Sequence, residues 1–301
     1  MKKFSGRRLW LSVVGMIMLF AVSILPAQAE TVDTVCDRVG KNTTVWKDVT
    51  GDGQADKLRF KLTKDEYGNY INKVQVNVNG KKALTLKSEG GFYMLTVQYI
   101  QIADGQQFLQ LFGTADNDYL VENRIFRYDS STGKLVKVLD LSKVNAVCGA
   151  VTEAAGRQIR IEFKKQPAET GWLHWEYTYV YKNGQFRLKS NTAAVYSSIG
   201  DFTAEDGYGA YFKNNEFVSS RSLTFYKGTG LKAKAFEAGK GDVLKLKKIR
   251  MSGGKIYLQF QKGNTRGWQR VDRGYLYQYD TDGSLIEESG WFYGVHNRLA
   301  G

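Results

Sequence analysis

The chain has 301 residues, of which 43% are hydrophobic and 13% aromatic, with 32 glycines and only 2 prolines. This composition is that of a folded chain and excludes disordered, collagen-like and low-complexity classes. Lysine and arginine total 43 against 30 acidic residues, which gives a net charge of +13. The excess is uneven, because residues 221–273 hold 14 basic and 3 acidic residues whereas residues 30–220 hold 24 and 23.

Residues 1–29 have the pattern of an export signal. Four positive charges stand in residues 1–8, residues 9–25 are almost wholly apolar, and Ala27-Gln28-Ala29 has the small-x-small form of a signal-peptidase site. We therefore expect cleavage before Glu30 and a secreted, extracellular protein that is associated with the cell wall. The alternative is an uncleaved anchor, because the apolar run just reaches the length of a membrane span. No later apolar run is long enough, so no transmembrane segment is expected after cleavage.

The chain contains two cysteines, Cys36 and Cys148. In an exported protein an even number of cysteines favours a disulfide, so we predict that these two are bridged. Such a bridge would tie the amino-terminal segment to a point more than 100 residues away. The alternative is a pair of buried free thiols.

Alternating apolar residues indicate β-strands after the signal. Period two with β-branched and aromatic residues is typical of half-buried strands, and no stretch has a long helical period. Glycine-containing hairpin signals such as Asn79-Gly80 and Asn183-Gly184 separate the runs. The clearest runs are Leu58-x-Phe60-x-Leu62, Val74-x-Val76-x-Val78, Ile159-x-Ile161-x-Phe163, Tyr177-x-Tyr179-x-Tyr181 and Ile256-x-Leu258-x-Phe260.

Glycines recur with a period near fifty residues. Gly53, Gly105 and Gly156 each open a strand signal, and each is followed 27 or 28 residues later by a hairpin glycine: Gly80, Gly133 and Gly184. Five copies, starting near residues 45, 98, 150, 201 and 249, fill residues 45–301, within a repeat domain that we assign to residues 30–301. Units of this size hold about four strands and bury their faces against one another. The prediction is an all-β fold, a β-propeller-like array of about five four-stranded blades.

An alternative architecture divides the chain near residue 200 into two smaller β domains. In that version Gly239–Val271 would form an SH3-like barrel of the kind that binds bacterial cell walls.

The loop from Asp48 to Asp56 is the strongest candidate for a metal site. Side-chain oxygens of Asp48, Thr50, Asp52 and Asp56 stand at positions 1, 3, 5 and 9, and the carbonyl of Gln54 is available at position 7. Calcium takes six to eight hard oxygen ligands, which alternate residues of a tight loop can supply. Position 12 is an arginine, so the loop is not a complete EF-hand.

This loop resembles the calcium loops of FG-GAP and VCBS repeats, which belong to the blades of integrin-like β-propellers, and in particular those of secreted Gram-positive bacterial proteins. The resemblance covers residues 48–60 and implies a structural Ca²⁺ that pins the loop without catalysing a reaction. Thr50 departs from the family, which has Asp or Asn there, and is a weaker ligand.

The sequence offers no catalytic motif. The two histidines, His174 and His296, share no motif with each other or with cysteine. We therefore expect no enzymatic activity. The alternative is a glycan-active hydrolase, since five-bladed propellers include glycosidases that use paired carboxylates; Asp52, Asp104 and Asp206 would be its candidates.

The basic segment is a candidate surface for polyanions. Its lysines and arginines are separated mostly by apolar or small residues, and Lys245 and Lys247 are expected on one face of a strand with Leu244 and Leu246 on the other. An anionic cell-wall polymer or acidic polysaccharide is the expected partner, and nucleic acid is not, because the chain is exported. The alternative is a face that only improves solubility. The candidate residues are Lys232, Lys234, Lys245, Lys247, Lys248 and Arg250.

The sequence thus predicts a secreted, non-catalytic, calcium-stabilised protein that binds or adheres at the cell envelope. The alternatives are the hydrolase and a cell-wall targeting protein with the SH3-like module.

Overall fold

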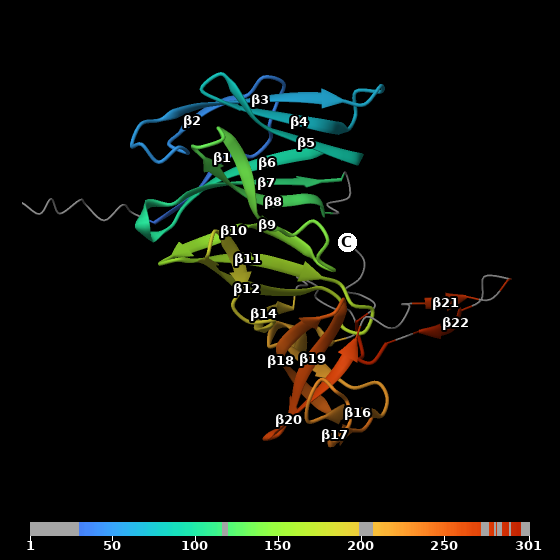
Figure 1. Ribbon diagram of the computed structural model, residues 1–301. Helices are drawn as coiled ribbons and strands as arrows, with labels where there is room; N and C mark the ends of the chain where they lie inside the picture. The colour runs from blue at the N-terminus through green and yellow to red at the C-terminus, as the bar shows by residue number, and fades with distance from the viewer. Residues whose placement is uncertain are drawn as a thin grey trace, which may run out of the picture.

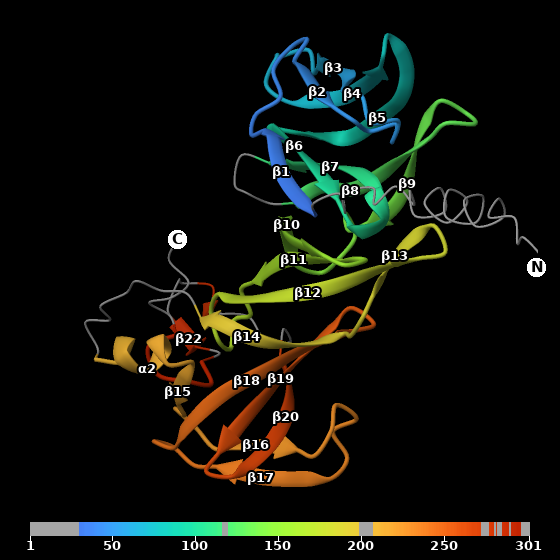
Figure 2. The same cartoon turned by 90° about the vertical axis from the view of Figure 1, so that its left-hand side faces the viewer.

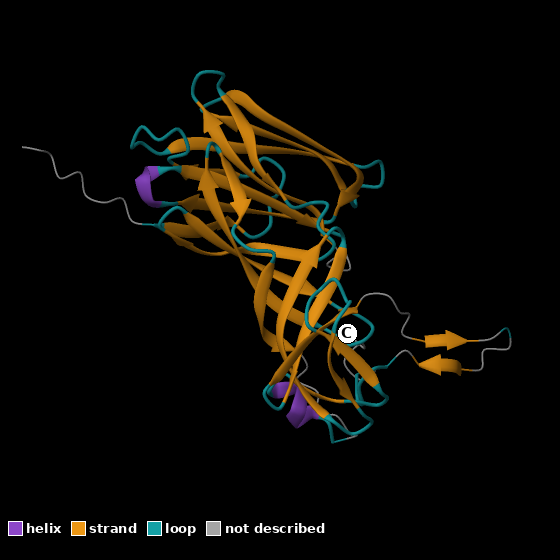
Figure 3. Cartoon of the chain, turned by 60° about the horizontal axis from the view of Figure 1, so that its bottom comes forward, coloured by secondary structure: helices purple, strands orange, loops and turns teal. Residues whose placement is uncertain are grey.

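The computed structural model describes residues 30–115, 120–198, 207–271, 277–279, 281, 285–288 and 290–295. The predicted signal peptide therefore lies outside the described residues. The described chain is built almost entirely of antiparallel strands, with a 3-10 turn η1 (Ala103–Gly105) and a short helix α2 (Gly209–Lys213) (Figure 3). The predicted all-β class is confirmed. None of the helices formed by these residues has the length and apolar character of a membrane span.

Two sheets form the amino-terminal half. The first sheet contains β2 (Thr44–Lys47), β3 (Asp56–Lys64), β4 (Ile71–Val78) and β5 (Lys81–Phe92). The second sheet has the order β1-β6-β7-β8-β9 and contains β1 (Thr31–Cys36), β6 (Met94–Gln101), β7 (Gln107–Thr114), β8 (Leu120–Asp129) and β9 (Lys134–Asp140).

A large sheet of eleven strands follows, with the order β10-β11-β12-β14-β18-β19-β20-β16-β17, while β13 pairs with β12 and β15 with β18. Its strands are β10 (Val147–Ala155), β11 (Gln158–Lys165), β12 (Leu173–Lys182), β13 (Gln185–Leu188), β14 (Thr192–Ser198), β15 (Glu216–Val218), β16 (Leu223–Tyr226), β17 (Lys234–Ala238), β18 (Val243–Ser252), β19 (Lys255–Lys262) and β20 (Thr265–Val271). A separate two-stranded sheet contains β21 (Tyr277–Tyr279) and β22 (Leu285–Glu288).

The glycines of the sequence repeat occupy equivalent places in three successive units, β2–β5, β6–β9 and β10–β13. Gly53, Gly105 and Gly156 precede the second strand of each unit, and the hairpin glycines join its third and fourth strands. All six have positive φ, from 59° to 83°, a conformation that side chains with a Cβ rarely adopt. The units stack face to face (Figure 2).

The regular four-strand pattern ends after β13. Strand β14 pairs with both β12 and β18, so the strands of the basic segment continue the large sheet. The alternative of an SH3-like barrel over Gly239–Val271 is therefore wrong: β18, its first strand, pairs outside the segment, and no sheet of the described residues closes into a barrel.

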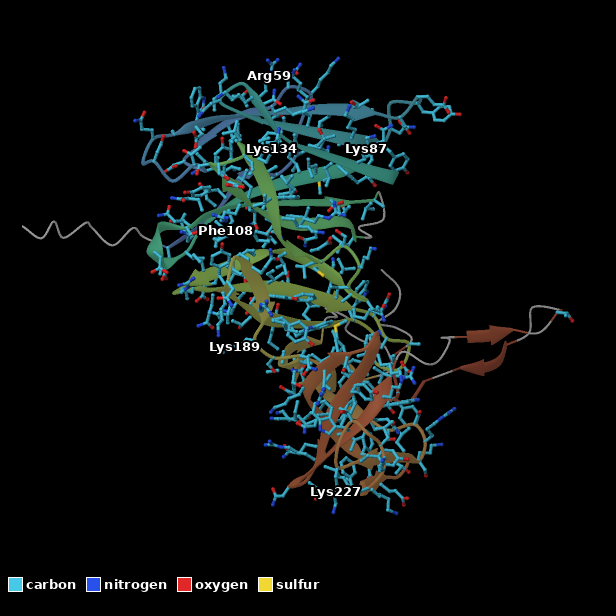
Figure 4. The ribbon with its side chains drawn as sticks, in the orientation of Figure 1. Arg59, Lys87, Phe108, Lys134, Lys189 and Lys227 are labelled. Carbon is cyan, nitrogen blue, oxygen red and sulfur yellow. The ribbon has the colours of Figure 1, made fainter. Side chains whose placement is uncertain are left out.

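Two hydrophobic cores lie on opposite faces of the second sheet. The first core joins the first and second sheets and includes Phe60, Val76 and Leu111. The second core joins the second sheet to the large sheet. There the ring centroid of Phe108, labelled in Figure 4, lies 4.9 Å from those of both Tyr181, edge to face, and Phe186, at a tilt.

The predicted disulfide is not formed, because Cys36 and Cys148 are free thiols. Cys36, on β1, packs against the first core, whereas Cys148, on β10, is buried in the second. The second sheet therefore lies between the two sulfur atoms.

A row of buried amide side chains fastens β10 to the second sheet. Strand β10 bulges between Cys148 and Val151, which leaves backbone groups without partners in β11. Gln98 and Gln110 both accept the Val151 N–H, at 2.8 and 3.0 Å, and Gln110 also donates to the Gly149 carbonyl at 3.1 Å. Asn123 donates to the Cys148 carbonyl at 3.0 Å. The three amides are at most 4% exposed, so they replace the missing ladder bonds inside the protein.

Candidate functional site

The acidic loop connects β2 to β3 and is closed by its own carboxylates. Asp56 is only 3% exposed, and its carboxylate accepts the N–H groups of Val49 at 2.8 Å and Thr50 at 2.9 Å. Its second oxygen accepts from the Asn79 side chain at 2.6 Å. With three hydrogen bonds, Asp56 is the internal anchor of the loop.

The other two carboxylates also accept backbone N–H groups. Asp48 accepts from Gly51 at 2.7 Å and from Gly53 at 2.9 Å, and Asp52 accepts from Gln54 at 2.8 Å. Both glycines have positive φ, which the tight turn requires. Among the residues that the structure describes, no group of three or more His, Cys, Asp or Glu side chains is gathered in the geometry of a metal site.

One buried side-chain atom of the loop has no hydrogen-bond partner. Thr50 Oγ1 is buried and makes no hydrogen bond, and burying an unpaired hydroxyl is costly. The donor set is composed of oxygen, as calcium prefers, and a cation beside Thr50, Asp48 and Asp52 would satisfy this atom. The residues therefore fit a calcium ion in their chemistry, with Asp56 holding the loop rather than free to turn toward the ion.

The loop also touches the second sheet. A Cβ built on Gly51 would lie 3.1 Å from Gln107 Oε1 on β7. Burial raises the pKa of Tyr99 on β6, and the nearby charges of Asp48 and Asp56 raise it further. The loop thus stands at the seam between the first two sheets, where fixing its conformation would also fix their packing.

The basic segment forms an outward face of the large sheet. On β18, Lys245 and Lys248 are exposed while Leu244, Leu246 and Ile249 are buried. The ladder with β19 shifts register between Leu246 and Lys248, so Lys247 sits in a bulge. The sequence prediction placed Lys247 on the regular face; the bulge instead makes it an extra residue and brings Lys248 and Arg250 into line with Lys245.

Cross-strand pairing assembles these side chains into two rows, because directly opposed residues of antiparallel strands share a face. One row is Arg250, Tyr257 and Arg270, on β18, β19 and β20. The other runs across five strands as Lys248, Gln259, Trp268, Tyr226 and Lys234. We call these eight residues the C-terminal basic face; side chains tipped with nitrogen surround β16–β20 in Figure 4.

The C-terminal basic face concentrates unpaired polar atoms. Among the described residues, six buried side-chain nitrogens or oxygens lack a hydrogen bond, and three of them belong to Arg250, Gln259 and Arg270. Lys248, Arg250 and Arg270 form no ion pair with a described residue. By contrast, Lys234 pairs with Glu237 at 3.0 Å and Lys245 with Glu216 at 4.0 Å. Lys232 lies in the loop between β16 and β17, outside both rows.

Tyr257, Gln259 and Trp268 were missed as site residues. The period of two that marks Ile256, Leu258 and Phe260 as core also places the intervening residues on the outer face, and this is the signal that could have found them.

The histidine that the structure describes lies in a small polar cluster on β11, β12 and β14. His174 Nδ1 is 3.2 Å from Glu162 Oε1, and the Tyr196 hydroxyl donates to the same oxygen at 3.0 Å. Burial lowers the pKa of His174, although the charge of Glu162 opposes this. Cys148 is no nucleophile for this histidine, because its sulfur faces the core and burial raises its pKa. Asp104 forms an ion pair with Arg157 at 3.3 Å; Asp206 and His296 lie outside the described residues.

Comparisons of the chain with protein-family models, with curated proteins and with solved structures gave no match.

Proposed function

We propose that the protein is a secreted, non-catalytic binding protein of the cell envelope whose C-terminal basic face binds an anionic cell-wall polymer. The observation that carries the proposal is the pair of cross-strand rows, which line up cations with Tyr257 and Trp268. Guanidinium groups bind phosphate or carboxylate through paired N–H donors, and aromatic rings stack on sugars or polyols. The orphaned Nε atoms of Arg250 and Arg270 would gain acceptors when an anion binds, which offsets the cost of burying them unpaired.

Calcium belongs to this proposal as a structural ion. Asp48, Thr50, Asp52 and the Gln54 carbonyl would hold it, with Asp56 anchoring the loop. The likeness of this loop to those of FG-GAP and VCBS repeats supports the assignment, as does the unpaired Thr50 hydroxyl. We also propose a propeller-like array for the four-stranded units, supported by the equivalent glycines of three units. Small-angle scattering of residues 30–301 tests this part: a closed ring has a smaller radius of gyration than an open stack.

The test of binding uses residues 30–301 sedimented with purified Gram-positive cell wall at graded salt concentrations, with calcium or with a chelator. We expect binding that weakens steeply with salt, because exposed charges are screened beyond about 10 Å at 0.1 M. The double variant R250S/R270S should bind at least roughly tenfold less, from the two lost contacts at an anionic surface.

Two further variants complete the design. R250K/R270K keeps both charges but removes the guanidinium fork and should recover only part of the binding. The matched control K182S/K189S loses two exposed charges in the middle of the molecule and should bind as the wild type does. Equal binding by R250S/R270S and the control would refute the proposal.

A second candidate function, glycan hydrolysis, is favoured by one observation. Glu162 and Glu176 stand directly opposite each other on β11 and β12, beside a cavity of about 260 Å³ that is lined in part by Glu162 and His174. Neighbouring carboxylates are what retaining glycosidases use. Release of reducing ends from cell-wall glycan that is lost in both E162Q and E176Q would establish this activity, and no release by the wild type would exclude it.

A further inference from the structure

The outer face of the first sheet carries a cluster of basic side chains, although the net charge of residues 30–220 does not indicate one. Strand β3 alternates from Asp56 to Lys61: Leu58 and Phe60 are buried in the first core, whereas Lys57, Arg59 and Lys61 are exposed. The segment 30–220 is nearly neutral, yet three successive outward positions of this strand are all cationic.

The ladder extends this pattern over the whole sheet. Arg59 pairs with Asn77, which pairs with Lys82; Lys73 pairs with Lys87. Directly opposed residues share a face, so each of β3, β4 and β5 contributes basic residues to the outward side of the sheet. Arg59 and Lys87 are labelled on this surface in Figure 4. We call the set the N-terminal basic face: Lys57, Arg59, Lys61, Lys73, Lys82 and Lys87.

No described acidic side chain neutralises the N-terminal basic face. The opposed positions between its basic residues hold Thr44, Gln75, Asn77 and Thr85. None of its six basic residues forms an ion pair with a residue that the structure describes. A field of unpaired cations on a flat sheet is the condition for attracting a polyanion.

An exposed tryptophan stands at the edge of this face. Trp46 on β2 pairs with Lys57 and is 59% exposed, and the Lys57 ammonium lies 5.7 Å from its ring centroid. The ring offers a surface on which a polyol or sugar can stack. The N-terminal basic face thus combines cations and an aromatic ring, as the C-terminal basic face does.

We propose that the N-terminal basic face is a second binding site for a flexible polyol-phosphate polymer. Alternate residues of a strand stand about 7 Å apart and neighbouring strands about 4.8 Å. In an extended polymer with one phosphodiester for each short polyol, successive phosphates can lie beside successive basic side chains at these spacings. Lysine ammonium groups suit phosphate as point charges. A rigid nucleic-acid duplex fits less well, because the described residues of this face form a sheet surface from which no strand or helix projects to enter a groove.

The two basic faces lie at opposite ends of the molecule, with the second sheet and β10–β14 between them (Figure 1). One protein therefore engages two separate polymer segments and cross-links them, and attachment at one face raises the effective concentration of polymer at the other. The cross-linking rests on the proposed function of the C-terminal basic face, whereas the second site stands on the first sheet alone.

The experiment mixes residues 30–301 with purified poly(glycerol phosphate) and measures affinity and light scattering. The variants are R59S/K61S for the N-terminal face, R250S/R270S for the C-terminal face and K182S/K189S as the charge-matched control. Arg59 and Lys61 are exposed, so unchanged thermal unfolding of R59S/K61S confirms that the fold is intact. Trp46 reports on its own face: its fluorescence should change with polymer in R250S/R270S, and W46F in that background should remove the change.

The wild type and the control should scatter light most strongly at an intermediate polymer-to-protein ratio, as a bivalent cross-linker does. R59S/K61S should still bind but give no scattering maximum, and R59S/K61S/R250S/R270S should bind at least roughly tenfold more weakly than either double variant. A scattering maximum that persists in R59S/K61S overturns the inference. Duplex DNA that competes as well as the polymer, at equal phosphate, overturns the ligand assignment.

The same variants separate the two proposals. If R59S/K61S loses binding and R250S/R270S binds as the wild type does, the N-terminal basic face is the sole site and the proposed function of the C-terminal basic face is refuted. The opposite result would refute the inference alone.

Discussion

The substitution Gln110→Leu tests whether the buried amide row holds the second sheet to β10. Gln110 is fully buried and makes three hydrogen bonds: to Asn123 Oδ1 at 2.9 Å, to the Gly149 carbonyl at 3.1 Å and from the Val151 N–H at 3.0 Å. After the substitution Val151 keeps Gln98 as acceptor and Gly149 keeps Asn123 as donor. Asn123 Oδ1 loses its partner, and a buried acceptor without one costs about 1–3 kcal/mol.

We expect Q110L to lower the free energy of unfolding by about 2 kcal/mol, which is a fall in Tm of about 4–8 °C for a chain of this size. Urea unfolding followed by tryptophan fluorescence measures it. Q110L/N123L should be less stable still, because the carbonyls of Cys148 and Gly149 then lose their amide donors. Gln185→Leu, at an exposed position, is the control. A Q110L protein within 0.5 kcal/mol of the wild type, or a double variant that regains stability, would refute this reasoning.

Three other predictions concern the loop, the histidine and the thiols. Calcium should raise the Tm of the wild type. The variant T50V loses both the unpaired hydroxyl and a calcium ligand, so in chelator its Tm should match or exceed that of the wild type, and calcium should raise its Tm by less. An equal rise in Tm would exclude Thr50 as a ligand. Because burial holds the pKa of His174 below its ordinary value of 6.5, protonation favours the unfolded chain. Stability should therefore be full above about pH 6.5 and fall as the pH drops below it, and H174Q should show a smaller loss of Tm between pH 7.5 and pH 5.5. In native protein at neutral pH, alkylation should label half-buried Cys36 faster than buried Cys148, whose pKa is raised, and labelling of neither thiol before reduction would mean that they are bridged.

Strand class and hairpin positions could be predicted because they are local. Alternation along Leu58, Phe60 and Leu62 follows from a sheet with one buried face, and Gly80 and Gly184 stand where a tight turn needs positive φ. The pairing of β14 with β18 could not be predicted in this way. It joins Thr192 to Arg250, 58 residues apart, through backbone hydrogen-bonding groups. These groups are the same whatever the side chain, so the sequence does not show which strands pair. The SH3-like alternative was wrong for this reason: the boundary drawn at residue 239 cut through a continuous ladder.

The disulfide prediction was wrong because an even number of cysteines does not show on which side of a sheet each cysteine lies. Cys36 and Cys148 are separated by a sheet whose two sides bury different cores.

Charge counting along the chain had a related weakness. It found the segment 221–273 but overlooked Lys57, Arg59 and Lys61, since the acidic residues that balance them in the sum lie elsewhere on the molecule. Period-two patterning already separates the two sides of a strand, so charge summed over alternate residues would have found this face.

The bulge at Lys247 gives β18 one position at which its length can change. A strand changes side at every residue, so Lys245 and Lys248 share a side only because an extra residue stands between them. Deleting Lys247 would restore strict alternation and leave Leu246 and Ile249 inside and Lys245, Lys248 and Arg250 outside. A single deletion in β19, whose ladder with β20 has no bulge, would instead turn the side chains that follow it to the opposite face. Among related chains, changes of length in this part of the sheet should therefore fall at the Lys247 position rather than in β19.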